Sequence, residues 1–174
     1  LIAYEFGMEK NDISILEKAA ALHDIGKIGI RDSVLQKEGK LTPEEYQHIQ
    51  EHVGITQNIL EKIHMSKDFS EITEIACSHH EKFDGSGYPD KLKGEDIPKI
   101  ARIIGVADAY DAMTSNRSYR KYLPQDKVRK EFEENKSSQF DSKMAEIMIK
   151  IIDEDTDYLL DRKSTRLNSS HECQ

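Results

Sequence analysis

The chain has 174 residues, of which 37% are hydrophobic and 33% are charged, so it is long enough for one soluble domain with a real core. Its formal net charge of −8 argues against a protein that coats a nucleic-acid polymer, because phosphate backbones attract basic surfaces. The two cysteines, Cys77 and Cys173, predict no disulfide framework and favour a reducing compartment. No signal peptide is visible and no apolar run approaches the ~18 residues of a membrane span, so the sequence predicts a cytoplasmic protein without a span.

Apolar residues recur at helical spacing in every long segment. In chain order, the pattern predicts helices from Asn11 or Asp12 to about Gly26, over 43–64, over 69–80, from Pro98 through Met113, from Pro124, and from Asp141 through Ile152. The second is the clearest, since Thr42 caps it, Pro43 takes the first position and Glu45 completes a capping box. Residues 27–41 and 83–97 are expected to be connecting loops. Without strand alternation, the pattern predicts an all-α fold, a helical bundle.

Two adjacent histidines, His79 and His80, end one apolar helical run and precede a glycine-rich loop that closes at Tyr88-Pro89. Neutral imidazole is the commonest metal ligand. A pair of surface histidines at a helix end would instead suit the helix dipole. On the pair alone, these two interpretations are equally good, and ligand-type residues from other helices decide between them.

Such residues come from three other predicted helices. His23 and Asp24 could both reach one centre only near the end of their helix, because neighbours on a helix point about 100° apart. Asp108 interrupts the apolar run 103–110, and a carboxylate on a core face is unfavourable unless it is paired or bound to metal. The alternative for Asp108 is a buried pair with Arg102 or Arg117. The combined candidate set is His23, Asp24, His52, His79, His80 and Asp108.

Imidazole and carboxylate ligands together suit Fe, Mn or Zn, and a shared aspartate suits a centre of two cations. Two close cations lower the pKa of a shared water molecule and neutralise the charge of a phosphodiester. Lys27, one turn after the His-Asp pair, and the basic stretch 117–121 are candidates to bind phosphate. A solvated basic turn is the alternative for that stretch. Asp111 shares a helix face with Asp108. We expect it to contact the metal ligands rather than the metals, or to pair with an arginine.

A second class of enzyme competes with this interpretation. His48-Ile49-Gln50-Glu51-His52 fits H-x-x-E-H, an inverted zinc-protease pattern in which two histidines bind zinc and the glutamate acts as base. This short pattern would leave the other candidate ligands without a role. A third interpretation is a non-catalytic module that binds a cyclic dinucleotide or a partner domain.

Six stretches together carry a resemblance to a known family. They are Leu22–Gly29, His79–Pro89, Ile97-Pro98, Ala101–Ile103, Val106–Ala112 and Arg117–Arg120. The combination resembles the HD-GYP family, the branch of HD-domain phosphohydrolases that hydrolyses cyclic di-GMP in bacteria. The resemblance covers about residues 1–155. It implies an HD-domain-like bundle with a binuclear or trinuclear metal centre, usually of iron or manganese.

By motif position, the resemblance implies that the six candidate ligands hold the metals and that Asp24 and Lys27 serve catalysis, with Lys27 near the hydrolysed phosphate. It implies that Arg117 and Arg120 grip the dinucleotide. The Gly85–Pro89 loop, with Gly87, Tyr88 and Pro89, would shape the substrate pocket and contact diguanylate cyclase (GGDEF) domains. The product would be linear pGpG, with GMP as a further product left open. A sensor or receiver domain upstream is usual in the family, and a homodimer is an assembly that the prediction allows.

The family carries a further histidine, and in trinuclear members a glutamate, on a helix upstream of the His-Asp pair. No histidine precedes His23 in this sequence. We therefore expect residues 1–160 to be an N-terminally truncated HD-GYP domain in which the first metal lacks a ligand. The polar, aperiodic residues 161–174 are expected to be a non-native or disordered tail.

Overall fold

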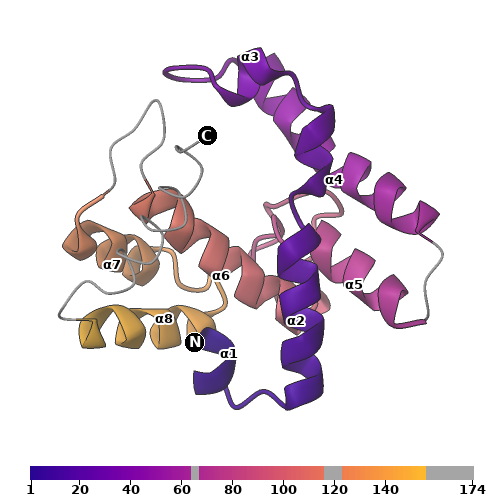
Figure 1. Ribbon diagram of the computed structural model, residues 1–174. Coiled ribbons are helices and arrows are strands. Elements are labelled where there is room, and N and C mark those ends of the chain that lie inside the picture. The colour runs from indigo at the N-terminus through magenta and orange to yellow at the C-terminus, as the bar shows by residue number, and fades with distance from the viewer. Residues whose placement is uncertain (64–66, 116–122, 156–174) are drawn as a thin grey trace, which may run out of the picture.

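The computed structural model describes residues 1–63, 67–115 and 123–155, and these form a bundle of helices (Figure 1). The α-helices are α1 (Ile2–Glu5), α2 (Lys10–Leu22), α3 (Asp32–Leu35), α4 (Pro43–Lys62), α5 (Lys67–Cys77), α6 (Lys99–Thr114), α7 (Gln125–Glu134) and α8 (Ser142–Glu154). Two 3-10 helices, η1 (Ile25–Gly29) and η2 (Gly94–Asp96), lie in the connections. Within the described residues, the only β-pairing is an isolated bridge between Lys136 and Phe140. The predicted all-α fold is confirmed.

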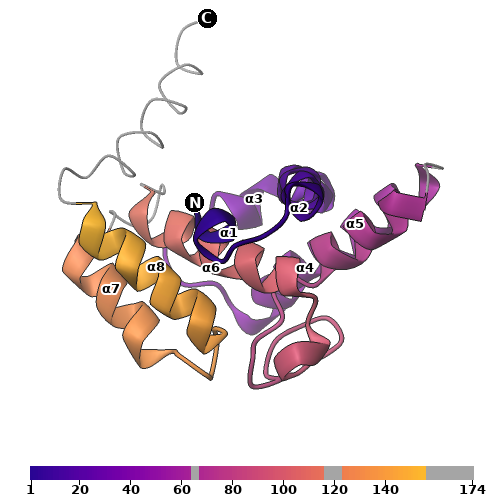
Figure 2. The ribbon, with the colours of Figure 1, turned by 90° about the horizontal axis from the view of Figure 1, so that it is seen from below.

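Helix α6 is the central element, because it contributes to both hydrophobic clusters of the core. On one side Val106 packs with residues of α1, α7 and α8, among them the fully buried Phe132 and Met144. On the other side Ile104 packs with residues of α2 and α5, among them Ala19. Figures 1 and 2 show α7 and α8 as a pair beside α6, with α2 and α5 beyond it. Helix α6, which carries Asp108, thereby lies between α7 and α8 on one side and α2 and α5 on the other.

The predicted start of α4 is confirmed in detail. The Glu45 N–H donates to Thr42 Oγ1 at 3.2 Å, and the Thr42 N–H donates to Glu45 Oε2 at 2.7 Å, which completes the capping box. Asp141 caps α8 as expected, since its Oδ1 accepts the Lys143 N–H at 2.9 Å.

Three predicted boundaries were wrong. Helix α2 begins at Lys10 after Glu9, not after Asn11 or Asp12, because the Ile13 N–H already donates to the Glu9 carbonyl at 3.0 Å. It ends at Leu22 rather than at about Gly26. Helix α5 ends at Cys77 rather than at residue 80.

The chain tightens at the end of α5. The Ser78 N–H is shared between the carbonyls of Glu74 and Ile75, and the Glu81 N–H then turns back to donate to the Ser78 carbonyl at 3.1 Å. His79 and His80 therefore lie on a turn. The connector 27–41, expected to be a loop, also contains most of η1 and all of α3.

In residues 1–63, 67–115 and 123–155, none of the helices combines the length and the apolar character that crossing a membrane requires. The expected tail, 161–174, lies outside the described residues, and so does Cys173. Cys77 is a buried free thiol, and burial raises its pKa to about 11.

Candidate metal centre

The structure brings the six candidate ligands together in two groups that share Asp24. The first group is Asp24, His52, His79 and His80, and the second is His23, Asp24 and Asp108. In each group the ligand atoms lie within 4.8 Å of one another. The residues come from the end of α2, the middle of α4, the turn after α5 and the centre of α6. Segments that are far apart in the sequence therefore converge on one aspartate.

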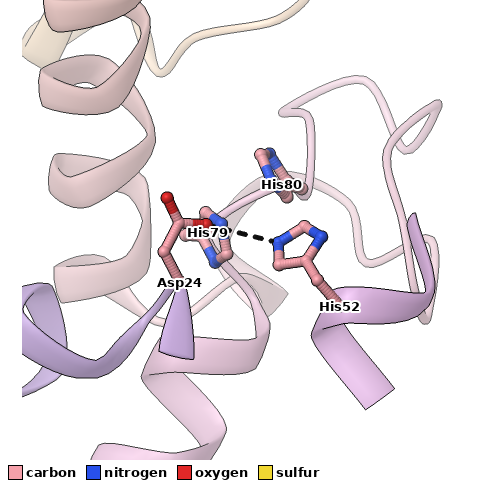
Figure 3. A group of neighbouring side chains, drawn as sticks. All are labelled: Asp24, His52, His79 and His80. Atoms are coloured by element: carbon pink, nitrogen blue, oxygen red, sulfur yellow. Dashed lines mark ion pairs between the residues drawn. The ribbon is translucent and has the colours of Figure 1, made fainter. Parts of the chain in front are cut away.

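The two oxygens of Asp24 face different histidines. Oδ1 lies 3.5 Å from His52 Nε2, and Oδ2 lies 3.4 Å from His23 Nε2. Figure 3 draws the contact of the carboxylate with His52 as a dashed line, and in this view the carboxylate overlaps the His79 ring. One carboxylate thus presents one oxygen to each ligand group, which is the arrangement that a bridging ligand requires.

A close approach of η1 to α4 sets the position of Asp24. The Gly26 N–H donates to Thr56 Oγ1 at 3.0 Å, and this hydroxyl donates to the His23 carbonyl at 3.3 Å. A Cβ on Gly26 would lie 2.0 Å from the His52 carbonyl oxygen, so only glycine permits this contact. The backbone of the His23-Asp24 turn is thereby held directly against the helix that carries His52.

Three of the histidine rings are oriented in the same way. Nδ1 of His23, His52 and His79 lies 2.6 to 2.7 Å from the carbonyl oxygen of the residue three positions earlier. This carbonyl fixes the proton on Nδ1 and leaves the Nε2 lone pair for a metal, an orientation typical of histidine ligands.

The buried atoms of the site support the same interpretation. Asp24 Oδ1, His52 Nε2 and His79 Nε2 are buried and have no hydrogen-bond partner among the residues that the structure describes. Buried polar atoms are normally satisfied, so three such atoms on neighbouring side chains indicate a bound cation. Nitrogen and oxygen donors in this mixture suit Fe, Mn or Zn. The residues therefore fit a metal centre.

The protonation of the site also favours cation binding. Burial lowers the pKa of His79 to about 4, and burial with the neighbouring histidines lowers the pKa of His80 to about 2. Burial likewise lowers the pKa of His52. For Asp24, burial acts to raise the pKa, but hydrogen bonds from His23 and Lys27 and their charges hold it below its ordinary range. At neutral pH the site therefore offers neutral imidazoles at His52, His79 and His80 and an ionised carboxylate at Asp24, the states that bind metal. For His23, burial acts to lower the pKa, but the hydrogen bond to Asp24 and the charge of that carboxylate raise it.

The lowered pKa of His79 predicts a loss of stability in weak acid. Below pH 6.5 the unfolded chain binds a proton at this imidazole, and the folded chain does not until about pH 4. The unfolding free energy of the metal-free protein should therefore fall by roughly 2 kcal/mol for His79 alone between pH 7.5 and pH 5. Denaturant unfolding in the presence of a chelator measures this change. A His79→Gln variant should show a shallower pH dependence, and equal wild-type stability at both pH values would contradict the prediction.

A cleft of about 450 Å³ opens in front of the metal-type residues, within the roughly 300–1,000 Å³ of small-molecule sites. Lys27, Tyr88 and Asp108 line it together with His52, His79 and His80. The Lys27 ammonium donates to Asp24 Oδ2 at 2.5 Å, so it lies at the shared carboxylate and at the cleft. The predicted position of Lys27 near a bound phosphate is compatible with this geometry.

The Gly85–Pro89 loop folds back onto the turn that carries the histidine pair. The Tyr88 N–H donates to the His80 carbonyl at 3.3 Å, and Tyr88 lines the cleft. Gly87 is buried, Pro89 is exposed, and the peptide bond between Tyr88 and Pro89 is cis. Arg117 and Arg120, the predicted dinucleotide-gripping residues, lie outside the described residues.

The structure tests part of the alternatives. Arg102 pairs with Asp141 rather than with Asp108, since its Nη1 donates to Asp141 Oδ2 at 2.6 Å, whereas a pair of Asp108 with Arg117 lies outside the described residues. Asp111 belongs to neither ligand group and is exposed, and its Oδ1 accepts the Ser115 hydroxyl at 3.1 Å. Its supporting role remains a prediction.

The inverted zinc-protease pattern does not assemble a site. His48 Nδ1 lies 2.7 Å from Glu51 Oε2, and His48 Nε2 accepts the Arg31 N–H at 3.3 Å. Both ring nitrogens of His48 are therefore engaged away from His52. Neither His48 nor Glu51 belongs to a ligand group among the described residues.

Two residues that hold the site were missed from the sequence. Thr56 joins η1 to α4 through its hydrogen bond with the Gly26 N–H. Buried Glu81 accepts the Asp90 N–H at 2.7 Å, which closes the Gly85–Pro89 loop. Tyr46, which is 51% exposed, lines the cleft as well. The only signal for Thr56 was a polar residue on the apolar stripe of α4, and Glu81 was visible only as part of the motif.

Comparisons with known proteins indicate the family of the chain. A family model described as HD domain matches residues 1–144. A cyclic di-GMP phosphodiesterase from Thermotoga maritima is 41% identical over 156 residues, which are 90% of this chain and 42% of that protein. The 3'3'-cGAMP-specific phosphodiesterase 2 of Vibrio cholerae is 37% identical over 154 residues, which are 88% of this chain and 29% of that protein. The solved structure of an HDG"Y"P protein from Bdellovibrio bacteriovorus shares the fold, with a TM-score of 0.70 and 19% identity over 87% of this chain and 48% of that one. The chain thus spans less than half the length of each of these proteins.

Proposed function

Since the chain belongs to the HD-domain family, in its HD-GYP branch, we propose that it is a metal-dependent phosphodiesterase that hydrolyses a cyclic dinucleotide. Cyclic di-GMP is the proposed substrate, linear pGpG the product, and iron or manganese the metal. The names of the two relatives support this class of substrate, since one acts on cyclic di-GMP and the other on 3'3'-cGAMP.

The observation that carries this proposal is the division of the Asp24 carboxylate between two ligand groups. Its Oδ1 faces His52 and its Oδ2 faces His23, so two cations could share it. Two cations that share a carboxylate would suit in-line displacement at phosphorus, because such a pair stabilises both the attacking and the leaving oxygen. A single zinc in the four-residue group would leave His23 and Asp108 without a role.

A pair of bound cations would supply an activated water and would neutralise the phosphate. Around it, the neutral histidines orient Nε2 toward the centre, and the cleft walls position the dinucleotide. Lys27 has three donors, of which Asp24 takes one, so it can also bind a non-bridging phosphate oxygen. As the water oxygen adds to phosphorus and gives up a proton to the surrounding water, the P–O3′ bond breaks, and the 3′-oxygen takes a proton from a protonated group or from water.

We also propose roles for the residues that would bind the substrate and a partner domain. Arg117 and Arg120 would grip the dinucleotide, and the Gly85–Pro89 loop would contact GGDEF domains in a bacterial cytoplasm. A module that binds the dinucleotide without cleaving it is the competing proposal. The neutral imidazoles and the partnerless buried ligand atoms favour the enzyme.

Hydrolysis by the anaerobically purified chain, loaded with Fe(II) or Mn(II), tests the proposal. We expect cyclic di-GMP or 3'3'-cGAMP to be converted to a linear dinucleotide, and expect a chelator to stop the reaction. Chromatography of the products and metal analysis of the same sample measure both expectations. Binding of either dinucleotide without cleavage by the metal-loaded chain would support the binding module, and a metal-free chain without binding would overturn both proposals.

A further inference from the structure

His80 is held differently from the other three histidines of the site. His23, His52 and His79 each direct Nδ1 to a backbone carbonyl oxygen at 2.6 to 2.7 Å. Within the described parts of the chain, no hydrogen bond to the His80 ring is present, although the ring belongs to the four-residue ligand group. Without such a bond, the imidazole needs another contact to keep one orientation toward a metal.

Aromatic rings provide that contact. The Tyr88 ring stacks on the His80 ring with the centroids 4.8 Å apart and the planes 29° apart. His79 lies against the same imidazole at 3.9 Å, and the His52 ring meets it edge-on at 5.1 Å. His79 and His52 are themselves candidate ligands, so Tyr88 is the stacking partner that has no place in either ligand group.

We propose that Tyr88 is a positioning residue, which orients His80 as a metal ligand by stacking on its imidazole. The inference rests on the proposed metal centre and adds a role for Tyr88 of the Gly85–Pro89 loop. Tyr88 would act through His80 rather than through contact with the reacting phosphate. An outer partner of this kind reduces the freedom of the ligand and thereby strengthens metal binding.

Backbone contacts of the loop hold Tyr88 next to His80. Gly87 packs so closely that an added Cβ would lie 2.3 Å from the Lys82 backbone nitrogen and 2.6 Å from the His80 carbonyl oxygen. The Tyr88 N–H then donates to the same carbonyl. Beyond Pro89, Glu81 accepts the Asp90 N–H and closes the loop. The backbone of Tyr88 is therefore hydrogen-bonded to the backbone of His80, the candidate ligand on which its ring stacks.

Two substitutions separate the ring from the hydroxyl. Tyr88→Leu removes the stacking surface and keeps an apolar side chain, whereas Tyr88→Phe keeps the ring and removes the hydroxyl. We expect the Leu variant to weaken the binding of one Mn(II) about tenfold, the lower end of the effect of losing a partner behind a ligand. The Phe variant should stay within about threefold of the wild type, because a stacked pair depends on the ring.

Titration of the metal-free protein with Mn(II) against a competing chelator measures the affinities. The visible spectrum of the Co(II)-substituted protein reports ligand geometry, and we expect it to change in the Leu variant alone. Tyr46→Leu is the matched control, because Tyr46 lines the same cleft but makes no ring contact with a histidine in the described structure. Thermal unfolding of each metal-free variant verifies that the fold is retained.

The possible results distinguish this inference from the proposed function. Wild-type protein without Mn(II) or Fe(II) binding would overturn the metal centre and the inference together. Metal binding and hydrolysis by the wild type, with unchanged affinity and spectrum in Tyr88→Leu, would overturn the positioning role alone. An equal loss in the Phe and Leu variants would assign the effect to the hydroxyl and reject stacking. A loss in Leu with recovery in Phe supports the proposal.

Discussion

Replacing Asp24 with asparagine should remove metal from both ligand groups and lower turnover by more than about a hundredfold, since losing even a partner behind a ligand costs 10–100-fold. The substitution keeps the shape of the side chain but removes the negative charge. It also replaces the oxygen that faces one of the two histidines with an amide nitrogen. Metal analysis and initial rates on the same anaerobic samples measure the two effects.

Two variants show whether Asp24 is shared. His52→Ala removes a ligand of the four-residue group alone, so it should lose less metal per chain than Asp24→Asn. Asp153→Asn breaks a surface ion pair in which Arg129 Nε lies 2.8 Å from Asp153 Oδ1. This control should change neither the metal content nor the rate. Full metal content and unchanged turnover in Asp24→Asn would contradict the bridging role. Equal metal loss in the Asp24 and His52 variants would contradict sharing but not ligation.

The sequence predicted those parts of the fold that depend on local patterns. Thr42 and Glu45 lie three residues apart at the start of a periodic segment, so the capping box could be predicted without knowledge of the tertiary structure. The end of α5 could not, because the turn after Ser78 depends on how this segment packs against α6. A Cβ on Gly105 of α6 would lie 2.9 Å from the His79 carbonyl oxygen, and no periodicity in residues 69–80 reports such a contact.

Some features of the candidate site could likewise be predicted from the sequence, and others could not. Asp108 stood out because an ionised carboxylate interrupts an apolar run, and it does lie in a ligand group. The Arg102–Asp141 pair could not be predicted, because it joins α6 to the start of α8 across 39 residues of sequence. The orientation of His52 and His79 by carbonyls of their own segments follows from local geometry, whereas the support of His80 by Tyr88 depends on the path of a whole loop.

Replacing Gly26 with alanine should both destabilise the protein and weaken metal binding. The added Cβ would lie 2.0 Å from the His52 carbonyl oxygen and 2.6 Å from the Thr56 nitrogen, so η1 must move away from α4. Overpacking of this kind costs about 1–3 kcal/mol, and loss of the hydrogen bond from the Gly26 N–H to Thr56 adds about 1 kcal/mol. The same movement displaces His23 and Asp24 from His52. We therefore expect a loss of roughly 2–4 kcal/mol in unfolding free energy.

Gly54→Ala is the matched control, because it lies on α4 and an added Cβ there has no heavy atom within 4 Å. Alanine is favoured over glycine within a helix by about 1 kcal/mol, so this variant should be as stable as the wild type or more stable. Denaturant unfolding of the metal-free proteins, followed by Mn(II) titration, compares the two variants. If Gly26→Ala unfolds with the wild-type midpoint and binds metal normally, the contact between η1 and α4 does not hold Asp24 in place. A loss of both properties in Gly26→Ala, with neither lost in Gly54→Ala, would show that this backbone contact aligns the shared aspartate with the histidine on α4.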